Sequence, residues 1–507
     1  MEKKQLLIVF VCTFFLFTGS AQAQYTFTGQ IRTRTEYRNG LGNLLPKGSD
    51  AAFLTSQRTN LSFGYKWDKL IFSTQIRDVR VWGQDASTIN NGDGNKLFLH
   101  EAWAEFILAT SLDSNSRLKV ENLSVKVGRQ ELLYDDARLL GNLDWMQQGR
   151  RHDAALIKFL HRGYQVDIGA AFNQNSDAFG KSGVFFSPNN SNAYATTTTG
   201  FLVAVPGSKP NFIPTADKNG APIVAGAGPG TNGMNQMYKT MQFIYVKKKF
   251  GQTTVSALLF KDDFSKWRLD SIGSATTGFA YGRNYDQVGT NSRITTGLNI
   301  NSVVGKASSD GQLSAQAFGY YQTGKDFNGI DLNAYHFGAN VMYQSGKFSA
   351  GPGYEVLSGN DKASDANHRF DPLYGTPHKF WGYMDFFYTG TGSPIAGLQN
   401  AFIKTKYSAK DLYITLDVHQ FWTAAQSANR IEGGNLNKAL GTEIDIVLNY
   451  NINKFVNLEL GYSTMFATNS LEYVKSELAG VPTQRATRHN AQWAYLMLNI
   501  RPGILKG

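Results

Sequence analysis

Four arginines near the start of the chain have the type and spacing needed to bind anions. Arg32, Arg34 and Arg38 stand at even positions of one segment, and Arg58 lies in the next segment of the same kind. Because successive side chains of a β-strand point to opposite faces, residues at even spacing share a face. A guanidinium group is planar and binds a carboxylate through two parallel hydrogen bonds. The spacing therefore predicts a surface that attracts carboxylates or other anions.

The segment that carries the first three arginines alternates between apolar and polar residues, as a strand with two different faces does. Its apolar positions include Tyr25, Phe27, Ile31 and Tyr37. Such runs recur to the end of the chain, with no sustained pattern of period 3.6. We expect eighteen strands, near residues 25–38, 57–67, 70–82, 97–110, 116–131, 150–161, 163–174, 237–249, 252–264, 289–303, 311–323, 331–344, 347–358, 397–408, 410–422, 440–453, 454–466 and 489–501.

The connections between these segments alternate in length. Eight are short, such as 250–251 and 408–410, and the nine others are longer, with one exception near 324–329. Bacterial membrane barrels have an even number of strands, short periplasmic turns and long extracellular loops. The pattern predicts an all-β fold, a transmembrane antiparallel β-barrel of about eighteen strands. The alternative is a secreted β-protein outside the membrane, which also contains alternating strands.

The predicted strands carry the side chains that a lipid-facing wall needs. Leu412, Ile414, Leu416 and Val418 share one uncharged face. Aromatic residues near the strand ends match the girdle that forms where barrels meet the membrane surface. These residues are Trp67, Trp82, Tyr164, Tyr245, Tyr462 and Trp493.

The N-terminal segment predicts export. Lys3 and Lys4 precede an apolar run over 6–17, and small residues follow at 21–23, as in a secretory signal that is cleaved near Ala23. The run is shorter than the roughly 20 residues of a membrane-spanning helix. We expect a signal peptide over 1–23 and a bacterial outer membrane barrel over 24–507, with a long loop at about 175–236. Cys12 lies in the signal, so no disulfide is expected.

The net charge and the absence of soluble-enzyme motifs limit the classes of molecule that this chain is expected to bind. The formal net charge is +11, and the basic residues are scattered singly along the strands of an exported chain. This excludes nucleic acid and favours an anionic solute or the phosphates of lipopolysaccharide in the outer membrane. We find no motif of a soluble enzyme, and His419 alone on a strand is read as structural. We therefore expect no enzyme activity, no cofactor and no metal site. Asp93, Asp361 and Asp365 fit loop turns better than calcium sites.

Eighteen strands are too many for wall side chains to fill the interior, so we expect a water-filled lumen. By parity the inward set includes Arg32, Arg34, Arg38 and Arg58, with Arg77 or Arg80 on the third strand. The acidic residues expected to point inward are Glu355, Asp417, Glu443, Asp445 and Glu459. Separate basic and acidic walls set a transverse field that selects charged solutes. The alternative is that these charges pair across neighbouring strands and brace the barrel.

Two blocks of sequence resemble a known family. The first block runs Gly128, Arg129, Gln130, Glu131, Leu132, Tyr134, Asp135, Asp136, Arg138, Leu139, Leu140, Gly141, Asp144, Trp145, Gly149, Arg150 and Asp153. The second block runs Phe370, Asp371, Pro372, Leu373, Tyr374, His378, Lys379, Phe380, Gly382 and Asp385. Both resemble the alginate export family of outer membrane porins. The resemblance implies an eighteen-stranded barrel whose electropositive constriction passes a uronate polymer or related anions.

The resemblance also implies roles for matched residues. Arg129, Glu131, Arg138, Arg150 and Asp153 are implied to line or brace the pore. The alternation of Leu123, Val125 and Val127 conflicts with this for Arg129, because it places that residue on the lipid-facing side. Either a bulge near Gly128 shifts the register, or Arg129 lies beyond the apolar band.

Together these patterns predict an outer membrane porin that passes anionic small molecules, with acidic sugars, an alginate-like polysaccharide or carboxylates as candidate solutes. One rival is a gated polysaccharide exporter that needs periplasmic partners. Another rival is a surface adhesin or structural barrel that its own loops plug.

Overall fold

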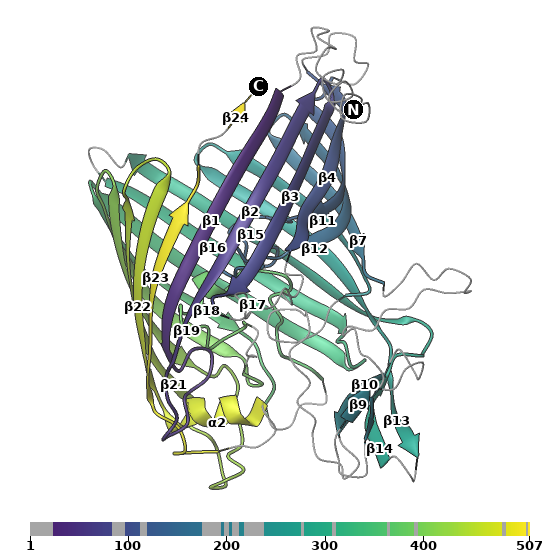
Figure 1. Ribbon diagram of the computed structural model, residues 1–507, viewed down its shortest axis with the longest axis vertical. Helices are drawn as coiled ribbons and strands as arrows, with labels where there is room; N and C mark the ends of the chain where they lie inside the picture. The colour runs from purple at the N-terminus through teal and green to yellow at the C-terminus, as the bar shows by residue number, and fades with distance from the viewer. Residues whose placement is uncertain are drawn as a thin grey trace, which may run out of the picture.

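The alternating segments form eighteen long antiparallel strands that close into one barrel (Figure 1). The first nine are β1 (Gln24–Asn39), β2 (Ala52–Trp67), β3 (Leu70–Val81), β4 (Leu97–Thr110), β5 (Asn122–Gln130), β6 (His152–His161), β7 (Tyr164–Phe172), β11 (Thr240–Phe250) and β12 (Thr253–Ser265). The others are β15 (Thr290–Lys306), β16 (Gly311–Lys325), β17 (Asp331–Ser345), β18 (Phe348–Leu357), β19 (Leu398–Ser408), β20 (Leu412–Trp422), β21 (Ala439–Asn451), β22 (Val456–Ala467) and β23 (Asn490–Ile500). Pairing of β1 with β23, from Ile31 opposite Ile500 onward, closes the sheet.

The structure is a computed structural model that describes residues 24–83, 97–111, 119–174, 194–196, 202–204, 212–216, 238–274, 278–306, 311–361, 366–389, 394–478, 483–502 and 505–506. The expected signal peptide with Cys12, most of the expected loop at 175–236, Asp93 and Asp365 lie outside these residues.

The eighteen predicted strands are confirmed, and β1 begins and β23 ends at the end of the barrel with the short turns (Figure 1). In bacterial barrels this end is periplasmic. The sequence did not predict the elements in the long loops: β8 (Tyr194–Thr196), β9 (Leu202–Ala204), β10 (Phe212–Ala216), β13 (Arg268–Ser274), β14 (Gly278–Asn284), η1 (Pro377–Lys379) and α2 (Asn469–Leu478). The short β24 (Leu505–Lys506) lies beside β1. Helix α2 begins after Thr468, whose hydroxyl accepts a hydrogen bond from the backbone N–H of Leu471.

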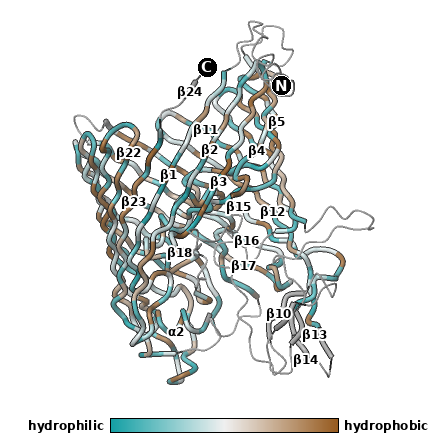
Figure 2. Tube along the Cα trace, viewed as in Figure 1, coloured by the Kyte–Doolittle hydropathy of each residue, from teal (hydrophilic) through white to brown (hydrophobic). Residues whose placement is uncertain are grey.

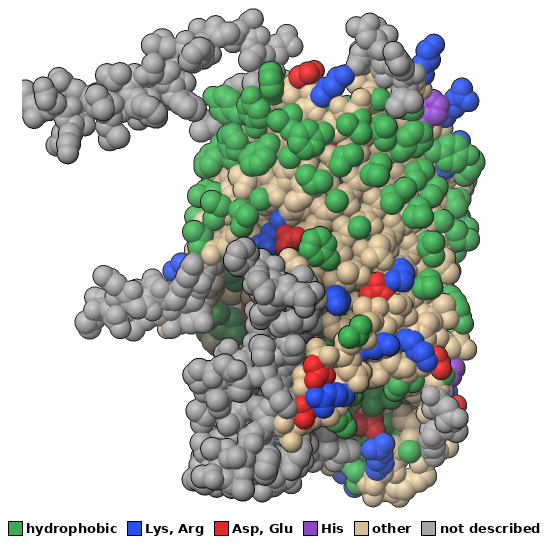
Figure 3. Space-filling view, turned by 90° about the vertical axis from the view of Figure 1, so that its right-hand side faces the viewer, with side chains coloured by type: hydrophobic (Ala, Val, Ile, Leu, Met, Phe, Trp, Pro, Cys, Tyr) green, Lys and Arg blue, Asp and Glu red, His purple; other side chains and the backbone are tan. Residues whose placement is uncertain are grey.

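Apolar and polar residues alternate along the strands (Figure 2), and the exposed fractions of their side chains place the apolar set on the outer face. Leu416 and Ile446, for example, are 40% and 43% exposed on the outer face, whereas Asp417 and Asp445 on the same strands are buried. Figure 3 shows apolar side chains gathered over the upper part of one side of the barrel, with charged side chains gathered below them. This surface is a belt for hydrocarbon contact. Among the described residues, no helix combines the length and apolarity needed to cross a membrane.

Two of the predicted girdle aromatics lie in the lumen instead. Tyr245 and Trp493 are each 1% exposed. The Trp493 Nε1–H donates to Glu36, and the Tyr245 hydroxyl donates to Asp135. Their strand positions have inward parity, so proximity to a strand end did not place them at the membrane surface. Trp67 and Trp82, by contrast, are exposed.

The two faces of β20 predict opposite effects of an introduced charge. Leu416→Arg places a cation in the apolar belt and is expected to lower the free energy of unfolding by about 2–4 kcal/mol. Thr415→Arg, one residue away, points into the lumen and is expected to cost far less. Denaturant unfolding of both variants in phospholipid vesicles measures the difference. A Thr415→Arg variant that is as destabilised as Leu416→Arg would contradict the orientation of this wall.

Candidate functional site in the lumen

Two long connections fold into the barrel and join each other there. They are the β5–β6 loop over 131–151 and the β18–β19 loop over 358–397. Their backbones pair: the Tyr374 N–H donates to the Leu139 carbonyl at 2.9 Å, and the Gly141 N–H donates to the Tyr374 carbonyl at 3.0 Å. Leu140 and Tyr374 are almost fully buried in a common apolar cluster. The lumen is therefore narrowed by a packed layer of loop residues.

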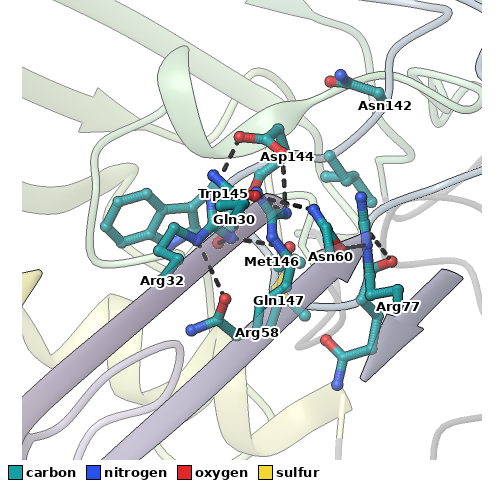
Figure 4. Close-up of polar contacts among 12 residues, drawn as sticks. Gln30, Arg32, Arg58, Asn60, Arg77, Asn142, Asp144, Trp145, Met146 and Gln147 are labelled. Atoms are coloured by element: carbon teal, nitrogen blue, oxygen red, sulfur yellow. Dashed lines mark hydrogen bonds and ion pairs between the residues drawn. The ribbon is translucent and has the colours of Figure 1, made fainter. Parts of the chain in front are cut away.

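Arg32 and Arg58 hold the first of these loops against the barrel wall (Figure 4). They are directly opposite each other on β1 and β2, and their exposures are only 4% and 2%. Asp144 bridges them: its Oδ2 lies 3.1 Å from Arg32 Nη1 and its Oδ1 lies 2.8 Å from Arg58 Nη1. Like charges directly opposite each other in a sheet repel. The Asp144 carboxylate relieves this repulsion and fixes the loop.

Neighbouring arginines bind the same loop through its carbonyl groups. Arg34 Nη1 donates to the Trp145 carbonyl at 2.8 Å, and Arg77 Nη1 donates to the Gln148 carbonyl at 2.7 Å. Arg34 also pairs with Glu36 on its own strand. Carbonyl groups accept hydrogen bonds without carrying a full charge. These contacts therefore hold the loop and leave much of the positive charge on the wall uncompensated.

Asp144 faces open space as well as the arginines. Its side chain is 53% exposed, whereas its two partners are buried. Partial burial raises the pKa of Asp144, but the Arg58 and Arg32 guanidinium groups outweigh this and hold the pKa below its usual value of 3.8. The carboxylate is therefore ionised at any pH near neutrality.

Carboxylates on the acidic side of the barrel hold the second loop, because they accept hydrogen bonds from its backbone N–H groups. Glu443 Oε1 accepts a hydrogen bond from the Met384 N–H at 2.7 Å, and Asp445 Oδ2 accepts one from the Tyr383 N–H at 3.4 Å. Glu355 on β18 binds Arg138 of the first loop in a buried ion pair. Other wall charges pair across neighbouring strands, as Lys404 on β19 does with Asp417 on β20 at 3.0 Å. The wall charges therefore both anchor the inward loops and brace the barrel.

The structure separates the predicted site residues into three groups. Eight point into the lumen from the wall: Arg32, Arg34, Arg38, Arg58, Arg77, Glu355, Glu443 and Asp445. Arg138 and Arg150 lie in the β5–β6 loop, where Arg150 Nη1 donates to the Gly375 carbonyl at 2.7 Å. Burial lowers the pKa of Arg150 to about 10, so its guanidinium stays charged. Arg80 and Arg129 lie on the outer face.

For Arg129 the expectation of a pore-lining position is wrong, and the reason is register. β5 pairs in continuous register with β6, so Arg129 stands opposite Asp153, and the alternation places both on the outer face. The two form an exposed ion pair with Arg129 Nε 2.7 Å from Asp153 Oδ1. Arg80 likewise pairs with Asp78 on the outer face of β3. Of the two candidates on that strand, Arg77 is therefore the inward one.

Two adjacent cavities lie on the periplasmic side of the first loop, with volumes of about 580 and 690 Å³. Both are lined by Asn142, Asp144, Lys454, Phe455 and Arg501. Carboxamide side chains dominate the rest of the polar lining: Gln30, Asn60, Gln75, Asn449, Asn451, Asn453, Asn457 and Asn499. Amide groups both donate and accept hydrogen bonds. The cavities therefore suit a solute that carries several hydroxyl groups beside an anionic group.

Sequence reasoning included Glu131 of this loop, which lines the 690 Å³ cavity, but it missed two other residues that the loop contributes to the site. Asp144 and Trp145 were part of the first resemblance block but received no role. Trp145 stacks on His378 of the second loop with ring centroids 4.3 Å apart, and the Arg34 guanidinium lies over the same indole at 4.2 Å. The concentration of the first resemblance block over 128–153 was the signal that this loop enters the site.

A closed barrel of eighteen antiparallel strands is the architecture of outer membrane porins, and solved structures bear this out. Pseudomonas aeruginosa OccK1 (OpdK) matches with a TM-score of 0.54 and 9% identity over 96% of this chain and 99% of that chain. The same protein solved with vanillate gives 0.53 at 9% identity over the same shares. Acinetobacter baumannii OccAB4 gives 0.53 at 10% identity over 95% of this chain and 98% of that chain.

The resemblance to the alginate export family is confirmed over part of the chain, because residues 23–171 match that family. The match includes β1 to β6, the arginines of the wall and the β5–β6 loop. The second resemblance block, over 370–385, lies outside it. Comparison with curated protein sequences gives no match.

The ionised form of Asp144 is expected to hold segment 142–148 in place. Because its pKa is lower in the folded state than in the unfolded state, this stabilisation is present above pH 3.8 and is lost as the pH falls through the folded value. Asp144→Asn should therefore loosen the segment at neutral pH. Hydrogen exchange of these backbone amides should be about tenfold faster or more. Asp411→Asn, in the exposed β19–β20 turn, is the control. Unchanged exchange in Asp144→Asn would contradict the bridging role.

Proposed function

We propose that this chain is an outer membrane channel that passes anionic solutes through its lumen, with carboxylates as the preferred class. The observation that carries the proposal is the buried arginine pair Arg32 and Arg58 beside the cavities, flanked by Arg34 and Arg77. Low-dielectric walls focus the field of such charges and raise the local concentration of anions. The guanidinium fork adds affinity for carboxylates in particular.

The charged residues that line the two cavities also favour anions over cations. Their cationic residues are Arg32, Arg58, Arg77, Lys379, Lys454 and Arg501. Their acidic residues are Glu101, Glu131, Asp144 and Glu459. The cations are in excess, and Lys454 and Arg501 lie at the periplasmic end, where they would attract anions from that side.

The solute class follows from the uncharged lining. We infer acidic sugars, because the carboxamide groups match hydroxyl groups and the Trp145–His378 stack offers a flat aromatic surface. The family match over residues 23–171 is consistent with a uronate. The vanillate complex of OpdK, a carboxylate bound to a barrel of the same fold, supports the coarser class of organic anions.

Permeation of three sugars of similar size tests the charge preference. In liposomes that contain the purified chain, galacturonate is expected to enter about tenfold faster than galactosamine, with galactose between them. Arg58→Met should reduce this ratio, because it removes a lumen cation. Arg129→Met, which removes the same charge from the outer face, is the matched control and should leave the ratio unchanged. Faster entry of galactosamine would overturn the proposal.

The carboxamide lining predicts a second, separable effect. The Asn457 side chain donates to Asn449 and Asn451 in the cavity wall. Asn457→Leu keeps the size of the side chain and removes its hydrogen bonds, each worth about 0.5–1.5 kcal/mol. Galacturonate entry is expected to fall about twofold to tenfold relative to acetate entry. Equal reductions for both anions would indicate a change in pore width, and the inference of a sugar would fail.

A channel that is closed until its loops move is the second candidate. It is favoured by the aromatic packing inside the barrel, where Phe370, Tyr374, Trp381 and Phe386 are almost fully buried. Failure of all three sugars to enter through the wild-type chain would favour this candidate. In this second candidate, the channel is a gated exporter that needs periplasmic partner proteins to open.

A further inference from the structure

The outer wall contains an apolar groove that is separate from the lumen. It lies across β6, β7, β11 and β12 and has a volume of about 450 Å³. Its walls include Ile157, Ile168, Ile244 and Leu259, which are all between 41% and 49% exposed on the outer face. The groove therefore opens into the belt that contacts hydrocarbon, and water does not compete for it.

Small residues create this groove. Ala155 and Ala170 stand opposite each other on β6 and β7 and point outward between the larger side chains of the walls. Gly169 forms the floor together with Phe243, whose ring lies against it from the lumen side. A Cβ atom added to Gly169 would lie 2.3 Å from that ring. The floor is therefore closed toward the lumen, and the groove is a depression that only a molecule on the membrane side reaches.

One end of the groove lies at the boundary between the apolar belt and a polar row. Gln242 and Lys261 are opposite each other on β11 and β12 and line the groove on its extracellular side. The next outward row toward the extracellular side contains Asp153, Phe172, Thr240 and Asp263, and its polar part beside Lys261 is Thr240 and Asp263. The groove is apolar along its length and has polar groups at its extracellular end. A lipid has the same arrangement, an acyl chain attached to a polar head group.

Lys261 has the capacity to bind a further anion at this end. Its ammonium group contacts the two oxygens of Asp263 at 2.5 and 2.6 Å. Thr240 and Ser292 also donate to that carboxylate, so Asp263 is shared among three donors. An ammonium group carries three donors, and the Lys261 side chain is 43% exposed. A phosphate oxygen therefore has both access and a donor.

We propose that the groove seats one acyl chain of a phosphate-bearing lipid of the outer leaflet, with the phosphate bound at Lys261. The chain fills the depression over Ala155 and Ala170, and the head group lies beside Lys261 and Thr240. This site is independent of the solute path, because the floor separates it from the lumen.

Lipid binding by the full-length chain tests the proposal. The purified barrel in detergent is titrated with lipid A, which carries phosphates, and with an uncharged diacylglycerol of matched chain length, and bound lipid is counted by native mass spectrometry. Ala155→Leu/Ala170→Leu fills the groove and is expected to weaken binding of both lipids about tenfold, or 1.4 kcal/mol. Lys261→Gln removes the ammonium group and is expected to weaken binding of lipid A only.

The control is Ala315→Leu/Ala317→Leu, which adds the same bulk at outward positions of β16, away from the groove. It should leave both affinities unchanged. Equal affinity of the filled variant and the wild-type chain overturns the proposal, and so does an equal loss in the control. A wild-type dimer that dissociates in the filled variant would make the groove a contact between two copies and would also overturn it. If the double variant fails to fold, Ala155→Val and Lys261→Gln carry the test.

Discussion

The structure depends on one constraint: a sheet in hydrocarbon has no water to satisfy the hydrogen bonds of a free edge. Pairing of β1 with β23 removes both edges, and it does so only after eighteen strands. A circle of that size cannot be filled by the side chains of its own wall. The interior must then be shaped by other segments, and the β5–β6 and β18–β19 loops provide them.

The sign of the charge on each part of the wall matches the backbone groups that the nearby loop presents to it. Guanidinium groups on β1 to β3 donate to the carbonyl groups of 144–148, and carboxylates on β21 accept the N–H groups of 383 and 384. The loops add ion pairs of their own, such as Asp144 with Arg32 and Asp371 with Arg293. The basic and acidic walls therefore have a structural role as loop anchors, and the excess of cations beside the cavities is available to solutes.

The sequence allowed the strands to be predicted because period-two alternation is local and each strand is long. Helix α2 was not predicted, since its ten residues lie within a loop and its apolar side chains, such as Leu471 and Val474, pack on distant segments. The inward arginines of β1 followed from parity. Arg129 did not, because a motif resemblance outweighed the alternation that placed it outside. The contact of Arg32 with Asp144 spans 112 residues, and no local pattern encodes it.

The reversal potential of the purified chain in a planar bilayer, under a KCl gradient, tests the central claim most directly. An arginine-lined lumen predicts a potential of the sign that chloride preference gives, with a smaller magnitude after Arg77→Met. A potential of the opposite sign, which indicates potassium preference, would contradict a path for anions along this wall.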